Sequence, residues 1–240
     1  MTEAYIRERL TACGVPCDER LSERLKDYLD LLLDWNMRMN LTRITDPEEA
    51  VDAHFADSLM ALTVPGLIPE NGTVIDVGTG AGFPGLVLAL ACPGLKVTLL
   101  DSLQKRLDFL AEVIGKTGAD NVTLVHARAE DGAGKPELRE RFDLATARAL
   151  APLPVLAEYL LPYVRVNGSA LCWKGPSLDA ELTAGRRAAH LLGGRVADPI
   201  PVSIPGRDWQ HSLLLIRKTG STPKAYPRKA GVPSKDPLGE

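Results

Sequence analysis

Residues 74–85 read VIDVGTGAGFPG, and this stretch decides the fold. Apolar and β-branched residues lead into a glycine-rich turn, and an apolar segment follows the turn. Glycines let a backbone approach a ligand without interference from Cβ atoms, and the first turn of a helix presents unpaired N–H groups. The stretch therefore predicts a buried strand, a tight turn and a helix, with a ligand at their junction or, as the alternative, a purely structural turn.

Two ligand patterns overlap in this turn. Gly78-x-Gly80-x-Gly82 fits the loop that holds the amino-acid part of S-adenosylmethionine, whereas Gly80-x-Gly82-x-x-Gly85 matches the dinucleotide fingerprint. Asp101 ends the next apolar run, where a carboxylate can accept both ribose hydroxyls of an adenosine or cap the helix that follows. A nucleoside site is predicted, and both cofactors remain open on these residues.

Beyond residue 65, short β-branched runs alternate with helical periods, a pattern typical of a parallel sheet with crossover helices. Prolines before the last run favour an antiparallel return of the chain, which suits a methyltransferase better than a dinucleotide enzyme. We expect an α/β, Rossmann-like class I methyltransferase fold with a seven-stranded, mostly parallel sheet, a terminal antiparallel hairpin and an N-terminal helical extension. The expected strands are Thr73–Val77, Lys96–Leu100, Val122–His126, Phe142–Ala147, Ser169–Trp173, Gly194–Val202 and Ser212–Arg217.

Residues 1–65 have helical periodicity. One helix of about five turns is predicted from apolar residues at three- and four-residue steps, which are Leu21, Leu25, Tyr28, Leu32, Trp35 and Met39. Asp46 followed by Pro47 and two acids predicts the start of a second helix that runs towards Leu62. We therefore divide the chain into a helical extension (1–65), a cofactor-binding domain (66–218) and a basic, proline-rich tail (219–240).

The net charge of −3 is unevenly distributed. Six basic residues stand against two acidic ones between Arg217 and Glu240, so the tail either holds an RNA backbone or is merely solvated. If it contacts RNA, its removal is expected to leave cofactor affinity almost unchanged.

The charged N-terminal segment does not resemble a signal peptide, the longest apolar run is too short for a bilayer, and the four cysteines have no metal-site spacing. These features predict a cytoplasmic protein without a metal or membrane contact.

Five motifs, in order and spacing, resemble the RsmG family, also called glucose-inhibited division protein B. They are Asn40–Thr42, His54–Leu59, Asp76–Gly85, Leu100–Arg106 and the tail Tyr226–Leu238. The resemblance implies transfer of a methyl group from S-adenosylmethionine to N7 of a guanine in 16S ribosomal RNA. It also implies cofactor contacts from Gly78, Phe83, Ala129, Glu130 and Arg148, to which the loop and strand positions add Gly80, Gly82 and Asp101.

Several cations lie at predicted strand ends or helix starts, where open α/β sheets bind ligands. Lys105, Arg106, Arg148 and Lys174 are candidates for contacts to guanine O6 and phosphates, and surface salt bridges are the alternative for Lys105 and Arg106. Many members of the family have arginine-histidine where this chain has Gln210-His211, so Arg207 is a candidate substitute. His54 and Asp57, one helical turn apart, are expected to bond each other in a structural role.

Guanine N7 carries an in-plane lone pair and no proton, so its methylation needs no general base. We therefore expect no catalytic residue and assign catalysis to positioning of the two reactants. The expected substrate is 16S ribosomal RNA or the assembling small subunit, bound by a monomer. The remaining alternatives are a methyltransferase with another substrate, a nicotinamide-dependent oxidoreductase and a non-catalytic RNA-binding protein of ribosome assembly.

Overall fold

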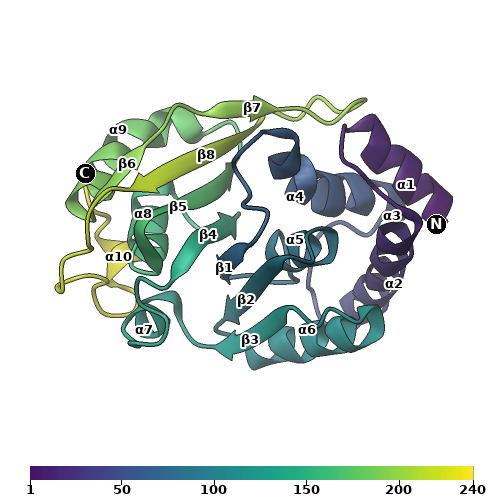
Figure 1. Ribbon diagram of the computed structural model, residues 1–240, viewed down its shortest axis with the longest axis horizontal. Helices are drawn as coiled ribbons and strands as arrows, with labels where there is room; N and C mark the ends of the chain where they lie inside the picture. Colours follow the sequence, from purple (N-terminus) through teal and green to yellow (C-terminus); the bar gives the residue numbers. More distant parts are fainter. Residues whose placement is uncertain (240) are drawn as a thin grey trace.

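One sheet of eight strands crosses the molecule in the computed structural model, which describes residues 1–239 (Figure 1). The strand order is β3-β2-β1-β4-β5-β8-β6, and β7 also pairs with β8. The strands are β1 (Gly72–Val77), β2 (Leu95–Asp101), β3 (Val122–His126), β4 (Phe142–Arg148), β5 (Val164–Lys174), β6 (Gly194–Val196), β7 (Ile200–Val202) and β8 (His211–Lys218).

The sheet is parallel from β3 to β5, and β8 runs antiparallel to β5, β6 and β7. The expected mostly parallel sheet with an antiparallel end is confirmed. One expected strand, Gly194–Val202, is corrected, because the chain leaves the ladder at residues 197–199 and returns as β7. Pro199 lies in this break, where its missing N–H cannot donate to a neighbouring strand.

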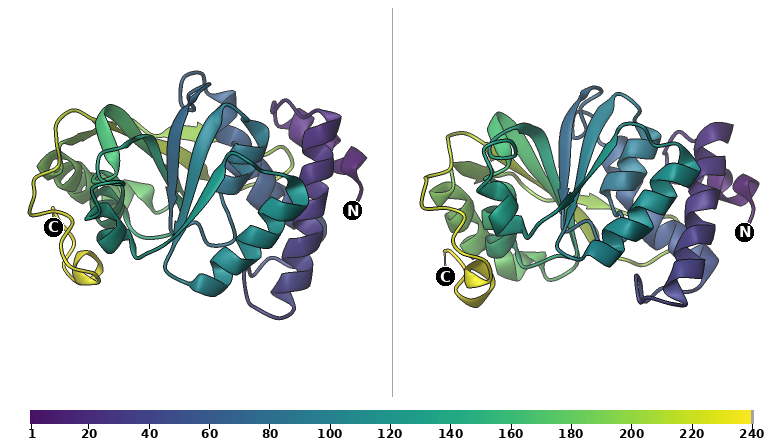
Figure 2. Two further views of the ribbon diagram at one scale, coloured as in Figure 1. Left: turned by 60° about the horizontal axis from the view of Figure 1, so that its bottom comes forward. Right: turned by 90° about the horizontal axis from the view of Figure 1, so that it is seen from below.

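Helices cover both faces of the sheet (Figure 2). The side chains of each strand alternate between two hydrophobic clusters, as the period of a strand requires: Val74 belongs to one cluster and Ile75 to the other. The first cluster includes α1 (Glu3–Ala12), α2 (Glu19–Asn36), the segment 47–63, α5 (Gly85–Ala91) and α6 (Gln104–Thr117). The second includes α7 (Ala129–Ala133), α8 (Leu153–Leu160) and α9 (Leu178–Leu191). No helix of residues 1–239 has the length and apolar character that a bilayer crossing requires.

The N-terminal helices follow the sequence pattern closely. Four of the predicted apolar residues of α2 are fully or nearly buried, but the helix ends at Asn36, so Met39 lies beyond it. The Asp46 side chain caps the next helix by accepting the Glu49 N–H at 2.8 Å, as predicted. This helix continues as α3 (Pro47–Ala50), η1 (Val51–Ala56), α4 (Asp57–Leu59) and η2 (Met60–Thr63), where η1 has π-helical bonding.

The C-terminal tail packs against the body as a strap, residues 219–239, which contains the short helix α10 (Val232–Lys235) next to α8 (Figure 1). Tyr226 and Leu238 are half-buried against the second cluster. Arg228 forms an ion pair with Glu158, whose side chain is fully buried. Of the two states that the proline-rich composition allows, a packed strap and a mobile tail, the structure has the strap.

Candidate active site

A buried carboxylate organises the glycine-rich loop. Asp76, at the end of β1, accepts hydrogen bonds from the hydroxyls of Thr79 (2.6 Å) and Thr146 (2.7 Å) and from the Gly85 N–H (3.1 Å). Burial raises the pKa of Asp76, and the three donors oppose that rise. This side chain therefore ties the loop to β4 and to the start of α5.

The glycines of the loop serve different purposes. A Cβ atom on Gly80, which has a φ of +60°, would meet open space, with the Gly78 carbonyl oxygen 4.0 Å away. On Gly82 it would collide with the Tyr28 hydroxyl and with Leu110, and on Gly85 with Asp76. Gly80 thus leaves room for a ligand, whereas Gly82 and Gly85 leave room for the protein itself.

Asp101 and the residues after β3 line one pocket, called the adenosine pocket below after the nucleoside that the sequence analysis predicts there. The Asp101 carboxylate accepts the N–H groups of Gly80 and Leu103, each at 2.9 Å, and is 1% exposed. Ala129 is the first residue of α7, so its N–H has no acceptor within that helix. The pocket is lined by Gly78, Leu100, Asp101, Ser102, Arg106, Ala127, Arg128, Ala129, Glu130, Leu150, Tyr159, Gly231 and Ser234.

A second pocket, called the acceptor pocket after the methyl acceptor that the sequence analysis predicts, lies beside residues 148 and 149. It is lined by Ala53, His54, Asp57, Arg148, Ala149, Trp173, Lys174, Gly175 and His211. Leu150 lines the adenosine pocket and Arg148 the acceptor pocket, so the two pockets adjoin at this short segment. Ala149 has a φ of +52°, a left-handed conformation that is uncommon for a residue with a Cβ atom and that clusters at functional sites.

Arg148 lies at the centre of the acceptor pocket and is held from three sides. Its Nη1 donates to Asp57 Oδ2 at 2.8 Å and to the Ala53 carbonyl at 2.5 Å, and its Nη2 donates to His54 Nδ1 at 3.3 Å. His211 Nδ1 donates to the other Asp57 oxygen at 2.8 Å. Arg148 therefore bonds to the side chains of both Asp57 and His54. Their own side chains form no direct hydrogen bond in the described structure, so the expected bond between them is corrected.

The network sets the charges of its members. Burial, together with the neighbouring Arg148, lowers the pKa of His54 to about 3, so this ring is neutral and donates Nε2–H to Thr42 at 2.9 Å. Burial alone would raise the pKa of Asp57, but the His211 hydrogen bond and Arg148 outweigh it, and the net pKa is lowered. The hydrogen bond to Asp57 raises the pKa of His211.

Phe83, in the glycine-rich loop, packs against two members of this network, His54 and Arg148. Its ring lies nearly parallel to those of His54, at 4.5 Å between centroids, and Tyr28, at 5.5 Å. The Arg148 guanidinium lies 5.2 Å from the same ring centre. The predicted cofactor residue Phe83 thus has a buried side chain that supports the acceptor pocket.

The other predicted cations have different surroundings. Lys174 lines the acceptor pocket with its side chain 8% exposed, and its Nζ lies 2.6 Å from Glu181. Arg106 pairs with Asp101 at 3.3 Å on the adenosine side, while Lys105 is exposed. Arg207 does not line the acceptor pocket and is paired with Asp52 at 2.7 Å in a pocket shared with Arg9.

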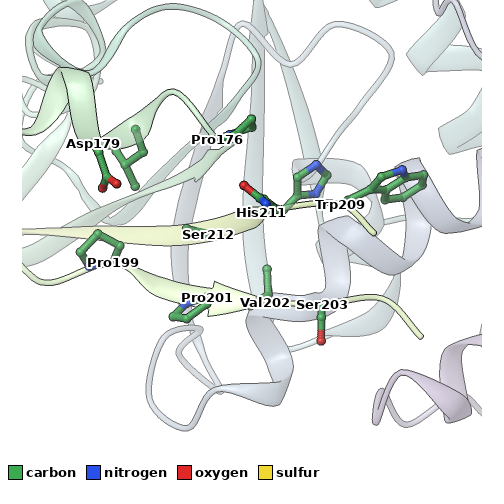
Figure 3. Close-up of a pocket in the computed structure, with 12 residues that line it drawn as sticks. Pro176, Asp179, Pro199, Pro201, Val202, Ser203, Trp209, His211 and Ser212 are labelled. Atoms are coloured by element: carbon green, nitrogen blue, oxygen red, sulfur yellow. The ribbon is translucent and has the colours of Figure 1, made fainter. Parts of the chain in front are cut away.

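A larger hollow adjoins the acceptor pocket and shares Gly175 and His211 with it. In Figure 3 the rings of Trp209 and His211 lie next to each other above the segment with Pro201, Val202 and Ser203, the first two of which belong to β7. The two rings stack with centroids 5.7 Å apart, and Arg207 covers the indole at 5.2 Å. This arrangement presents a half-exposed indole beside the acceptor pocket. Among the described residues, no cluster of His, Cys, Asp or Glu is arranged to hold a metal ion.

Sequence reasoning missed three parts of this site. Asp76 was visible as a lone charge inside an apolar strand, which is a signal for a buried and bonded carboxylate. The pairing of Asp57 with His211 joins residues far apart in the chain and leaves no local pattern. Gly231 and Ser234 belong to the tail, and nothing in its basic, proline-rich sequence indicates that these two residues line a pocket.

Comparison with known proteins gives a consistent result. Residues 21–203 match the family described as rRNA small subunit methyltransferase G. The ribosomal RNA small subunit methyltransferase G of Clostridium perfringens (strain 13 / Type A) is 46% identical over 233 residues, which cover 97% of each chain. Its counterpart in Alkaliphilus metalliredigens is 48% identical over 237 residues, with 99% of each chain covered, and that of Symbiobacterium thermophilum is 49% identical over 238 residues, covering 97% of this chain and 96% of the relative.

Solved structures share the fold at low sequence identity. A mutant of MtNAS in complex with S-adenosylmethionine has a TM-score of 0.54 at 19% identity, covering 85% of this chain and 79% of that one. A mutant of the 16S rRNA (adenine(1408)-N(1))-methyltransferase from Catenulisporales acidiphilia, with its cosubstrate SAM, has a TM-score of 0.53 at 18% identity, covering 74% and 93%. The predicted class I methyltransferase fold is therefore confirmed.

Proposed function

The chain belongs to the rRNA small subunit methyltransferase G family, and we propose that it methylates N7 of a guanine in 16S ribosomal RNA with S-adenosylmethionine as the donor. The observation that carries this proposal is the pair of pockets that adjoin at residues 148–150. One is lined by residues suited to an adenosine and the other by fixed cations. A donor that extends from the first pocket would present its methyl group where the two pockets adjoin, next to a base held in the second.

The adenosine pocket and the adjoining loop fit S-adenosylmethionine. Gly80 leaves space that a Cβ atom would fill, Asp101 supplies carboxylate oxygens for the ribose, and the Ala129 N–H is available to the adenine edge. We propose Gly78, Gly80, Gly82, Phe83, Asp101, Ala129, Glu130 and Arg148 as the residues that hold or shape this site. S-adenosylmethionine, when bound, supplies an electrophilic methyl group on a sulfonium centre.

The residues of the acceptor pocket would hold the guanine. Arg148 and Lys174 carry N–H donors beside the pocket, which suit O6 of guanine or an RNA phosphate. The guanine ring gains positive charge as N7 is methylated, so these cations would contact O6 or phosphate and stay away from the imidazole part of the base. Because the N7 lone pair is already free, the protein contributes alignment of the two reactants and exclusion of water.

The substrate guanine must leave its stack to reach this pocket. Trp209 and the hollow around it supply an aromatic surface for a neighbouring unstacked base, a common mode of RNA recognition. Lys105 and Arg106 are proposed as rim contacts to phosphates. Arg207 is proposed only as a secondary contact, because Asp52 already neutralises it.

We further propose that the protein acts as a cytoplasmic monomer on free 16S RNA or on the assembling small subunit. The segments 1–65, 66–218 and 219–240 would serve as acceptor-side extension, cofactor domain and strap. Ala53, His54 and Asp57 of the first segment line the acceptor pocket, which supports this division.

The test is transfer of a radiolabelled methyl group to ribosomal RNA from cells that lack this protein. The proposal expects label in 16S RNA only, recovered after digestion as 7-methylguanosine. Label in another base, in protein or in a small molecule would point to a methyltransferase with another substrate. Binding of NADH without binding of S-adenosylmethionine would favour the oxidoreductase alternative instead.

A further inference from the structure

We infer that the C-terminal strap is a wall of the cofactor site, with Ser234 and Gly231 fixing the adenosine end of the ligand. This inference rests on the proposed function, since it concerns the same pocket. It also reverses the expectation that removal of the tail leaves cofactor affinity unchanged.

The strap reaches the pocket directly. Gly231 and Ser234 line it together with Asp101, Ala129 and Glu130, although well over a hundred residues separate Asp101 from Ser234 in the chain. The Gly231 N–H donates to Glu130 Oε1 at 2.7 Å. The strap therefore orients a carboxylate that borders the ligand.

A second contact closes the same side. The hydroxyls of Ser234 and Tyr159 lie 2.8 Å apart, and both residues line the pocket. Both line the same pocket as Asp101 and Ala129, the residues proposed to bind the ribose and the adenine, and of the glycine-rich loop only Gly78 belongs to this lining. We therefore place the adenosine part of the ligand against the strap.

Buried charges anchor the strap. Arg228 donates to both oxygens of Glu158 at 2.8–3.2 Å, and the Glu158 side chain is 0% exposed. Arg139 also donates to the carbonyls of Tyr226 (2.8 Å) and Thr222 (3.0 Å). Because a buried carboxylate without a partner is strongly unfavourable, release of the strap would leave Glu158 in an unfavourable environment, and the strap is held in place.

Calorimetric titration of the full chain with two probes tests this inference. S-adenosylhomocysteine contains the whole cofactor except the methyl group, and 5′-methylthioadenosine lacks the amino-acid part. The variants are Ser234→Ala and the double variant Arg228→Ala with Glu158→Gln, which removes the ionic anchor of the strap without leaving a buried charge. Lys235→Ala is the matched control, because Lys235 is exposed on the same short helix and does not line the pocket.

We expect the double variant to bind both probes about tenfold more weakly and Ser234→Ala about threefold more weakly, in line with the loss of one or two hydrogen bonds. Lys235→Ala should be unchanged. By reciprocal linkage, S-adenosylhomocysteine should slow tryptic cleavage after Lys229 in the wild type. Thermal melts without ligand separate these effects from loss of folding.

Unchanged affinity of folded Ser234→Ala for both probes would overturn the inference, as would a loss confined to S-adenosylhomocysteine. Cleavage after Lys229 at the same rate with and without ligand would also contradict it. A wild-type protein that binds neither probe would instead contradict the proposed function, so the two failures are distinguishable.

Discussion

The two pockets beside residues 148–150 differ in their charge. In the adenosine pocket, the two carboxylates of Asp101 and Glu130 are balanced by the guanidinium groups of Arg106 and Arg128. In the acceptor pocket the basic side chains Arg148, Lys174 and His211 outnumber the one carboxylate of the lining, Asp57, and they are held in place by Asp57 and Glu181. The carboxylates of the first pocket suit ribose hydroxyls, and the basic second pocket suits RNA. The comparison shows that basic side chains at a predicted RNA site can be held in fixed positions by buried carboxylates, and need not be free surface side chains.

The largest effect should come from breaking the basic side at its centre. Arg148→Ala removes one of the two side chains that pair with the buried Asp57, leaving only His211, and is expected to destabilise the fold by up to about 3–5 kcal/mol. Arg106→Ala on the adenosine side removes a half-exposed pair and should cost at most about 1 kcal/mol. Urea unfolding of both variants measures the difference, and equal losses would contradict the comparison.

The next effect concerns two glycines of one loop. Gly82→Ala forces a Cβ atom against Tyr28 and Leu110, so we expect about 1–3 kcal/mol of destabilisation from overpacking, in addition to the backbone cost. Gly80→Ala meets no protein atom closer than 4.0 Å, so its main effect should be weaker binding of S-adenosylhomocysteine. Thermal melts and calorimetry on both variants check this. If Gly80→Ala binds as the wild type does, Gly80 does not face the ligand.

Removal of the Asp101 carboxylate from the adenosine pocket should weaken only the binding of the methyl donor and its product. Asp101→Ala is expected to lose about 1–3 kcal/mol of affinity for S-adenosylhomocysteine, because a charge-assisted hydrogen-bond acceptor is lost. The matched variant Lys174→Ala, on the basic side, should keep that affinity and lose methyl transfer to RNA. An Asp101→Ala protein that binds the cofactor normally but fails to use RNA would reverse the assignment of the two pockets.

The smallest effect is a dependence of stability on pH. The pKa of His211 is raised by its bond to Asp57, so its stabilising contribution is complete below the ordinary value of about 6.5 and is lost as pH rises through the raised value. His211 is partly exposed, so solvent screening should keep this contribution below about 1 kcal/mol. His54 stays neutral across this window, because its pKa is about 3.

Thermal unfolding between pH 5 and 9 of the wild type and of His211→Gln gives the contribution of His211. The wild type should lose part of its higher stability relative to the variant as pH rises. A difference in stability that does not change with pH would show that Asp57 does not raise the pKa of His211.

Much of the adenosine side could be predicted from the sequence, because its parts are contiguous. The loop, Asp101 and Ala129 each follow a strand whose β-branched pattern is visible locally, and the strand order then brings them together. Packing details were not visible. Nothing local indicates that Gly82 makes room for Tyr28 while Gly80 leaves an opening.

The acceptor side was only partly predictable, because its partners come from distant segments. Arg148 and Lys174 were found as cations at strand ends, but the carboxylates that hold them lie elsewhere in the chain. Arg207 is a candidate because it lies close to Gln210-His211 in the sequence, and no local pattern indicates that it pairs with Asp52 beside Arg9. The tail appeared to be a charged appendage, since its anchoring depends on the buried Glu158 in α8.

The most direct test of the account is methyl transfer to two forms of 16S RNA, one with guanosine and one with 7-deazaguanosine at the methylated position. The 7-deaza base keeps O6 and the base-pairing edge but lacks the N7 lone pair. The account predicts that both RNAs bind with similar affinity and that only the guanosine form is methylated. Transfer to the 7-deazaguanosine form at a comparable rate would contradict it.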